Sequence, residues 1–331
     1  MSPPIKRREF FTVVGGVAAW PLAARAQQPR QMRIVGVFSG MSSEGQGQVL
    51  FQAFKEQLAS LGWTDGRNVR FVYRWAVGDA GNVRAYAAEM VGTKPDAILA
   101  MTVPALTALS QSTVSIPLVF TNVSDPVEGG FVKSVARPGG NITGFTSFEY
   151  SIGGKWLELL KETVPSLKRV LVLLNQENYT SRALLRTIET ASPTIGVHVT
   201  SAPVRNIAEI ESAIGVFARE SDGGIILLPN PLFQIHQPRI IELAVTHRLP
   251  SLHQSRTFPD AGGLMSYGTD FPDLYRRAAS YVDRILKGAN VAELPVQYPT
   301  KYELVINLKA ATAIGLTLPP IMLTRADAVI E

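Results

Sequence analysis

The sequence predicts an α/β protein built from two Rossmann-like, doubly wound lobes joined by a multi-strand hinge. Apolar β-type runs such as Arg33 to Phe38 and Arg169 to Leu174 alternate with helix-like segments almost without interruption. Strands separated by helices of about ten to fifteen residues are typical of right-handed crossovers in a parallel sheet. The alternation breaks and begins again after Phe145, which indicates two units of similar architecture.

The first half of the chain carries five predicted strands, at 33–38, 68–73, 97–101, 117–120 and 142–145. Apolar residues at helical spacing over 50–61 and 83–91 predict two helices between them. Pro104, shortly after Thr102, indicates a third helix, because proline is favoured in the first helical turn. Asp125 followed by Pro126 predicts a fourth helix with the carboxylate as its N-cap.

The second half repeats this pattern. Strands are predicted at 169–174, 197–201, 224–228, 249–252 and 264–267, and helices at 157–164, 181–192, 206–219 and 235–247. An amphipathic helix from Leu274 to Ile285 follows a break rich in small residues. If the chain returns there to the first lobe and later to the second, several strands form a hinge. Lobes joined by a single linker are the alternative. The expected lobes are 33–146 with 268–300, and 147–267 with 301–325.

The N-terminus predicts an export signal over residues 1–26. Lys6, Arg7 and Arg8 precede a short apolar run that ends in Ala24-Arg25-Ala26. A basic flank, a short apolar segment and a small-x-small cleavage site are typical of secretory signals, and the paired arginines favour the twin-arginine route. The general route and a retained membrane anchor are the alternatives. A periplasmic location is therefore expected.

The charge and the cysteine content of the sequence exclude several classes of protein and site. Without residues 1–26 the chain keeps 28 basic and 26 acidic residues, so the high pI is largely a property of the signal. No basic stripe remains that would indicate nucleic-acid binding. The absence of cysteine excludes disulfides, a thiol nucleophile and thiolate metal sites. The large apolar content must therefore hold the fold together by its core.

Enzyme motifs are incomplete in this sequence. Gly45 and Gly47 begin a dinucleotide-binding pattern, but Leu50 stands where the third glycine belongs. Neither a phosphate-binding loop nor the HExxH or GxSxG motif occurs, and the four histidines show no ligand spacing. The prediction is a protein without catalytic residues, cofactor or metal. An exported α/β hydrolase or racemase is the alternative.

Polar loops at the carboxyl ends of the predicted strands indicate a small-ligand site, because such loops carry helix N-termini with free N–H groups. Hydroxyls of the first lobe suit a ligand carboxylate, and Asp125 suits an ammonium unless it only caps its own helix. Tyr179, Tyr267 or Trp75 could stack on an aromatic ligand, with ordinary packing as the alternative. A further cleft loop is expected at 253–256. The expected site comprises Ser39, Gly40, Thr102, Thr121, Asn122, Asp125, Asn175, Tyr179, Asn230 and Tyr267.

Several blocks in a fixed order carry a family resemblance: AWPLAARAQQ, VFTNVSDPVEGGFV, RPGGNITGFT, HRLPSL, FPDAGGLMSYG and YELVINLKAATAIGLTLP. Together they resemble the ABC-transporter substrate-binding family that includes tryptophan- and tyrosine-binding proteins. The resemblance implies a type I periplasmic binding fold that closes on a small solute, with a membrane permease and a cytoplasmic ATPase as partners. It also implies an amino acid, often aromatic, or a related organic acid as ligand. An extracellular sensor that delivers its ligand to a receptor is the alternative.

Overall fold

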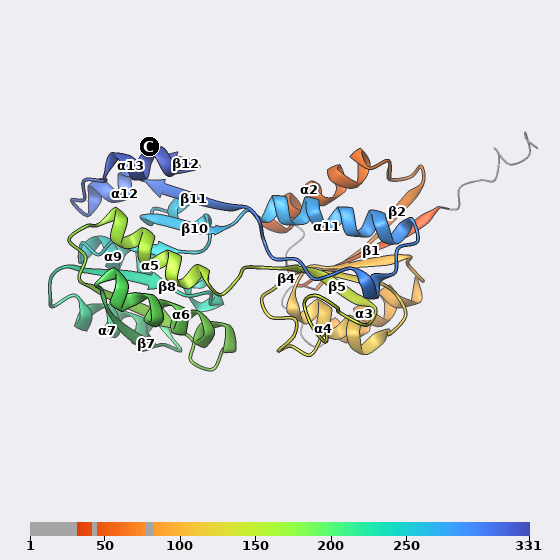
Figure 1. The fold of residues 1–331 in the computed structure, drawn as a ribbon, viewed down its shortest axis with the longest axis horizontal. Coiled ribbons are helices and arrows are strands. Elements are labelled where there is room, and N and C mark those ends of the chain that lie inside the picture. Colours follow the sequence, from red (N-terminus) through yellow and green to blue (C-terminus); the bar gives the residue numbers. More distant parts are fainter. Residues whose placement is uncertain (1–31, 42–44, 77–81) are drawn as a thin grey trace, which may run out of the picture.

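The computed structural model describes residues 32–41, 45–76 and 82–331. The predicted export signal lies outside these residues. The described chain forms two lobes that lie end to end, each built around its own twisted sheet (Figure 1). The α/β fold class predicted from the alternating pattern is confirmed.

The sheet of the first lobe is parallel throughout and has the order β2-β1-β3-β4-β5. Its central strands are continuous apolar runs because both faces are covered by helices. The strands are β1 (Arg33–Ser39), β2 (Val69–Trp75), β3 (Ala97–Ala100), β4 (Leu118–Val123) and β5 (Ile142–Thr146).

Helices cover both faces of this first sheet. The apolar side of α2 (Gln46–Ser60) packs against α11 (Phe271–Leu286) on one face, where Phe54 and Tyr275 are fully buried. The helices α3 (Val83–Gly92) and α4 (Val103–Ser112) pack together on the other face. A segment more than two hundred residues downstream of α2 thus completes the core of the first lobe.

The sheet of the second lobe has the order β12-β11-β10-β9-β8-β6-β7, and the β10–β11 pair is its antiparallel one. From β7 to β10 the winding repeats that of the first sheet. The strands are β6 (Arg169–Leu174), β7 (His198–Pro203), β8 (Gly223–Leu227), β9 (Ser251–His253), β10 (Met265–Thr269), β11 (Tyr302–Asn307) and β12 (Ala328–Ile330).

Two apolar clusters hold the second lobe. One forms around Trp156 of α5 (Ile152–Thr163), and the other around Ile214 of α7 (Ile207–Phe217) and Phe258 of α10 (Thr257–Asp260). The central strands β6 and β8 are therefore buried on both sides, while the edge strand β7 is largely exposed. The helices of this lobe are α5 (Ile152–Thr163), α6 (Tyr179–Ile195), α7 (Ile207–Phe217), α8 (Pro231–Ile235), α9 (Gln237–Thr246), α10 (Thr257–Asp260), α12 (Leu308–Ala313) and α13 (Pro320–Arg325).

The chain passes between the lobes after β5, after β10, and between the short 3-10 helix η2 (Val291–Glu293) and β11. These passages are tied to one another: the Thr269 hydroxyl donates to the Ser147 carbonyl at 2.5 Å, and Lys301 pairs with the Asp270 carboxylate at 2.9 Å. Adjacent crossing segments of this kind form a hinge. The exact limits of the two folding units, as expected from the sequence, stay a prediction.

The prediction that a helix begins at Asp125 and Pro126 is wrong. The chain makes a single turn there, and Gly130 ends it with a positive φ of 70°. The Gly130 N–H bonds to the Val127 carbonyl and the Phe131 N–H to the Pro126 carbonyl, which is the Schellman pattern of a helix end. The capping signal was correct, but the glycine pair stops the helix after one turn.

The helix predicted over 235–247 is interrupted at His236, where α8 ends and α9 begins. Pro238 lies in the first turn of α9, and a proline ring clashes with the carbonyl four residues earlier and offers no N–H. The sequence reading also missed β11 and β12, which extend the second sheet beyond β10. Their pairing depends on contacts with strands that lie far away in the sequence.

Candidate ligand-binding cleft

A cavity of about 570 Å³ lies where the carboxyl ends of the strands of both lobes meet, and we call it the strand-end cavity. Loops after β3 and β4 line it from the first lobe, and loops after β6, β8 and β9 line it from the second. Such crevices are where open α/β sheets bind ligands. The lining comprises Val103, Val123, Ser124, Asp125, Glu128, Gly129, Phe131, Asn178, Tyr179, Thr180, Pro229, Asn230, Pro231, Gln234 and Gln254.

Ser39, Gly40 and Thr102 lie together beside this cavity, at the ends of β1 and β3. The Thr102 oxygen accepts from the Gly40 N–H at 3.1 Å and caps α4 through the Ala105 N–H at 3.4 Å. A side chain at Gly40 would lie 2.9 Å from that oxygen, so glycine permits the close approach. The Thr102 hydroxyl accepts in both bonds and keeps its proton to donate.

Thr121 and Asn122 form the end of β4. Thr121 is fully buried, and Asn122 has a positive φ of 57°. The Asn122 amide donates to the Met101 carbonyl at 3.3 Å and to the Tyr275 hydroxyl at 3.1 Å, while its own oxygen is buried and has no hydrogen-bond partner among the described residues. Burial raises the pKa of the Tyr275 phenol. These residues are a polar cluster beneath the strand ends and do not line the cavity.

The two carboxylate oxygens of Asp125 accept hydrogen bonds from different parts of the chain. Its Oδ1 accepts from the N–H groups of Val127 and Glu128, at 3.2 and 2.9 Å, which is the expected cap. Its Oδ2 accepts from the Tyr150 hydroxyl at 3.2 Å. Tyr150 follows the first passage between the lobes, so this bond joins the first lobe to the start of the second. Burial first, and the charge of Asp125 as a lesser cause, raise the pKa of Tyr150 to about 12.

From the second lobe, Tyr179 and Asn230 line the strand-end cavity. Asn230 caps α8 through the Leu232 N–H at 3.0 Å. The Tyr179 ring meets the edge of the Tyr150 ring with 6.4 Å between centroids, and the Arg182 guanidinium lies 5.9 Å from its centroid. An aromatic surface therefore faces the cavity from this lobe. Of the ten predicted residues, the structure brings Asp125, Tyr179 and Asn230 together in the cavity lining.

Asn175 and Tyr267 are not brought to this cavity. The Asn175 side chain accepts from the Glu177 N–H at 2.9 Å within its own loop. Tyr267 stacks on Tyr302 with centroids 5.6 Å apart and packs against the core of the second lobe. Side chains alternate along a strand, so the face that Tyr267 occupies is turned away from the cleft. Trp75 likewise packs against the core of the first lobe.

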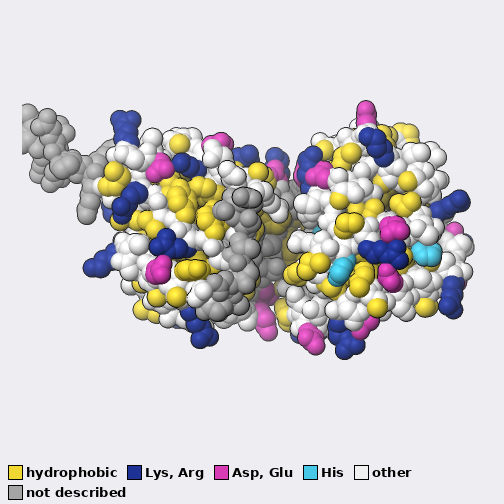
Figure 2. Space-filling view, turned by 180° about the vertical axis from the view of Figure 1, so that it is seen from behind, with side chains coloured by type: hydrophobic (Ala, Val, Ile, Leu, Met, Phe, Trp, Pro, Cys, Tyr) yellow, Lys and Arg dark blue, Asp and Glu magenta, His cyan; other side chains and the backbone are white. Residues whose placement is uncertain are grey.

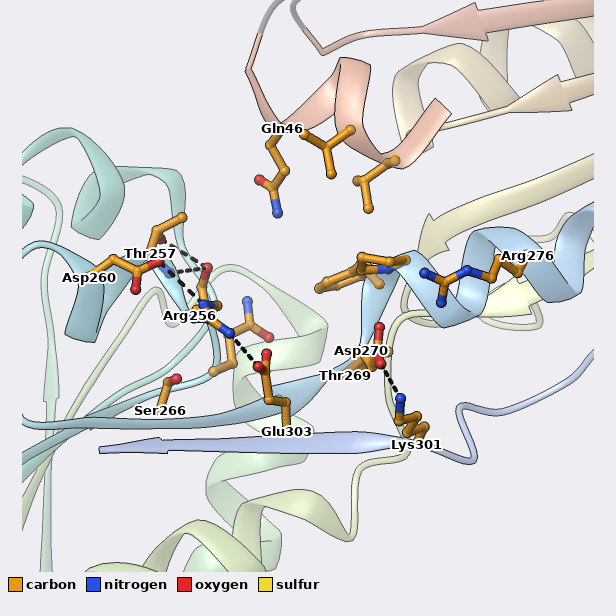
Figure 3. Close-up of a pocket in the computed structure, with 17 residues that line it drawn as sticks. Gln46, Arg256, Thr257, Asp260, Ser266, Thr269, Asp270, Arg276, Lys301 and Glu303 are labelled. Carbon is orange, nitrogen blue, oxygen red and sulfur yellow. Dashed lines mark hydrogen bonds and ion pairs between the residues drawn. The ribbon is translucent and has the colours of Figure 1, made fainter. Parts of the chain in front are cut away.

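A second cavity of about 430 Å³, the hinge cavity, lies between α2 and the hinge (Figure 3). Gln46 of the first lobe faces the loop after β9 across it, and Arg256 of that loop pairs with Glu303 at 2.5 Å. The sequence reading marked the loop at 253–256 but missed the rest of this lining. The return of the chain to the first lobe, which the sequence did predict, brings Phe271, Pro272 and Arg276 of α11 into this lining. The lining comprises Gln46, Val49, Leu50, Gln254, Ser255, Arg256, Thr257, Asp260, Ser266, Gly268, Thr269, Asp270, Phe271, Pro272, Arg276, Lys301 and Glu303.

Within residues 32–41, 45–76 and 82–331, no group of three or more acidic, histidine or cysteine side chains could hold a metal ion. The same residues contain no helix that is both long and apolar enough to cross a membrane. Figure 2 shows Lys and Arg interspersed with Asp and Glu over the face seen there. On that face the charges form no broad patch of one sign.

Two doubly wound lobes that share a hinge and line one cleft define a two-lobed ligand-binding protein. The chain belongs to the ABC transporter substrate binding protein family, which residues 35–330 match. The predicted resemblance and fold are thereby confirmed. The family binds solutes and works with transporter partners.

The chain is similar to the tyrosine-binding protein of Clostridioides difficile, with 28% identity over 257 residues that cover 77% of this chain and 73% of that one. Among solved structures it is similar to a conserved domain protein of Vibrio cholerae, with 28% identity, a TM-score of 0.77, and 90% and 100% of the two chains covered. An ABC domain from Streptococcus pneumonia in complex with L-Trp shares the fold, with 24% identity, a TM-score of 0.78, and 91% and 100% covered.

Proposed function

We propose that the protein is the periplasmic solute-binding component of an ABC importer. The open lobes admit a small organic solute, and contacts from both lobes stabilise a closed form that delivers it to a membrane permease driven by a cytoplasmic ATPase. The observation that carries this proposal is the strand-end cavity, because loops of both lobes line it. A ligand can shift the equilibrium only by its difference in affinity for the two forms.

The ligand class that we propose is an amino acid, preferably aromatic, or a related carboxylate. The tyrosine-binding relative supports this class. Within the described residues, the lining of the strand-end cavity holds the carboxylates Asp125 and Glu128 and no Lys or Arg, which suits an ammonium group. Phe131 and Tyr179 in the same lining suit an aromatic ring.

The carboxylate of that ligand is assigned to the first lobe. The Thr102 hydroxyl lies at the N-terminus of α4, where backbone N–H groups and the helix dipole favour an anion. The Ser39 hydroxyl is buried nearby at the end of β1, where it accepts from the Met41 N–H. The proposal needs no covalent chemistry, cofactor or metal. Removal of residues 1–26 after export would release the mature chain into the periplasm.

The direct test is a thermal-shift and calorimetric screen of residues 27–331 against amino acids, aromatic acids and short-chain carboxylates. L-tyrosine or L-tryptophan at a hundred times its dissociation constant should stabilise the protein by about 2.7 kcal/mol. Binding should be one to one, and the ligand should be recovered unchanged. If the screen finds no ligand among these classes, or if the pure protein turns the ligand over, the proposal is wrong.

Variants of two predicted residues test the site. Asp125→Asn keeps the capping oxygen but removes the charge, and Thr102→Val removes the hydroxyl at the start of α4. Each should weaken ligand binding by about tenfold or more, since a hydrogen bond to a charged group is worth about 1.5–3 kcal/mol. Thr107→Val is the matched control, because its hydroxyl bonds within α4 to the Val103 carbonyl. Unchanged affinity in both site variants would refute the assignment.

A further inference from the structure

Gln254 is the residue that the two cavities share. Among the described residues that line the strand-end cavity and the hinge cavity, it alone lines both. It is the first residue after β9, whose carboxyl end faces the cleft. A ligand that occupies the middle of the cleft therefore passes beside its carboxamide.

The backbone of Gln254 is fixed to the second lobe. A Cβ atom at Gly268 of β10 would lie 1.8 Å from the Gln254 carbonyl oxygen, so only glycine allows the loop this close. The next residue, Ser255, donates its N–H to Nδ1 of His253 at 3.1 Å. Arg256 then pairs with Glu303 of β11 (Figure 3). The loop is thus anchored to its own lobe and moves with it.

The side chain of Gln254, in contrast, is uncommitted. It is half-buried, and its carboxamide makes no hydrogen bond to any residue in the part of the chain that the structure describes. A carboxamide offers two N–H donors and one carbonyl acceptor. Because the backbone is already fixed, a ligand has to order only the side chain, which costs about 0.5–1.5 kcal/mol.

The charged side chains that line the strand-end cavity indicate which group of the ligand forms a hydrogen bond with Gln254. Asp125 and Glu128 supply negative charge there, and no Lys or Arg of the described chain belongs to that lining. A ligand carboxylate in the strand-end cavity is therefore met by neutral donors of its lining. The first lobe offers the half-buried hydroxyl of Thr102, next to Val103 of this lining, and the second lobe offers the amide of Gln254.

We propose that Gln254 donates a hydrogen bond from its Nε2 to the α-carboxylate of the bound amino acid and so selects amino acids over the corresponding amines. This inference rests on the proposed function. A carboxylate held by hydroxyls of one lobe and by the amide of the other is bound better when the lobes are closed. Gln254 therefore couples recognition of the carboxylate to closure.

The test compares L-tyrosine with tyramine, which lacks the carboxylate, by calorimetric titration of the wild type, Gln254→Ala and Gln254→Glu. For tyrosine, Gln254→Ala should bind about tenfold or more weakly, and Gln254→Glu more weakly still, because a second carboxylate repels the first. Tyramine affinity, where measurable, should change little in Gln254→Ala. Gln111→Ala is the matched control, since this exposed glutamine of α4 lines neither cavity and should leave both affinities within about twofold of the wild type.

The outcomes separate the inference from the function it rests on. A wild type that binds tyrosine while Gln254→Ala binds it equally well overturns the inference alone, and so does an equal loss for tyrosine and tyramine. A wild type that binds no amino acid overturns the proposed function and the inference together. Where tyramine binds too weakly to be measured, the tyrosine affinity should fall in the order wild type, Gln254→Ala, Gln254→Glu. Any other order overturns the inference. Unchanged unfolding temperatures of the free variants confirm that folding is intact.

Discussion

Trp156→Ala should lower the free energy of unfolding by about 4 kcal/mol, because the substitution empties the largest fully buried site in the described chain. Trp156 lies in α5 at the centre of the main core of the second lobe. Its indole N–H donates to the Tyr267 carbonyl at 2.7 Å, and that acceptor loses its partner in the variant. Both the cavity and the lost hydrogen bond lower the free energy of unfolding.

The measurement is urea unfolding followed by circular dichroism. Trp156→Phe keeps most of the ring and should lose clearly less stability than Trp156→Ala. Trp63→Ala is a matched control in the first lobe, because the Trp63 indole also donates a hydrogen bond, to Asp283 at 2.8 Å, yet the side chain is only half-buried. If Trp156→Ala costs no more than Trp63→Ala, the second lobe does not depend on this core.

Stability should fall as the pH drops from about 6.5 toward 4, and His253 should account for part of that fall. Burial lowers the pKa of His253 to about 4, from an ordinary value of 6.5. Its Nδ1 accepts from the Ser255 N–H and carries no proton while it does so. In the unfolded chain the same imidazole takes up a proton at higher pH. The unfolded state therefore binds more protons between these values, and unfolding becomes easier by about 1.4 kcal/mol per pH unit.

Across this window the histidine contributes about 3 kcal/mol. His253→Asn retains a side-chain acceptor for the Ser255 N–H but does not titrate, so its stability should depend less steeply on pH between 6.5 and 4. The control is His247→Asn, which changes an exposed histidine at the end of α9 and should leave the slope as it is in the wild type. Denaturant unfolding at half-unit pH steps gives the comparison. Equal slopes for His253→Asn and the wild type would contradict the buried neutral imidazole.

The sequence predicted the fold well where local patterns decide it. The predicted strands at 33–38 and 169–174 match β1 and β6 to within a residue, because strands buried on both faces are continuous apolar runs. The turn at Asp125 was predicted less well, since a capping signal marks where a helix begins and says little about where Gly130 ends it. The strands β11 and β12 were missed because they pair with distant segments.

The candidate site was predictable to the extent that strand ends converge. Asp125, Tyr179 and Asn230 belong to loops after β4, β6 and β8, and the parallel sheets bring these loops to one cavity. Tyr267 was predicted wrongly. The packing of α5 against β10 determines which face of this strand points to the core, and the sequence does not show that packing. The role of Gln254 depends on the contact of its backbone with Gly268, which no spacing in the sequence reveals.

The central claim is that two hinged lobes close on one small amino acid. Small-angle X-ray scattering of the mature chain, with and without L-tyrosine at a concentration that calorimetry shows to be saturating, tests it most directly. A smaller radius of gyration with the ligand bound is the predicted result, because closure brings the lobes together over the strand-end cavity. Identical scattering profiles for the free and the saturated protein would contradict the account.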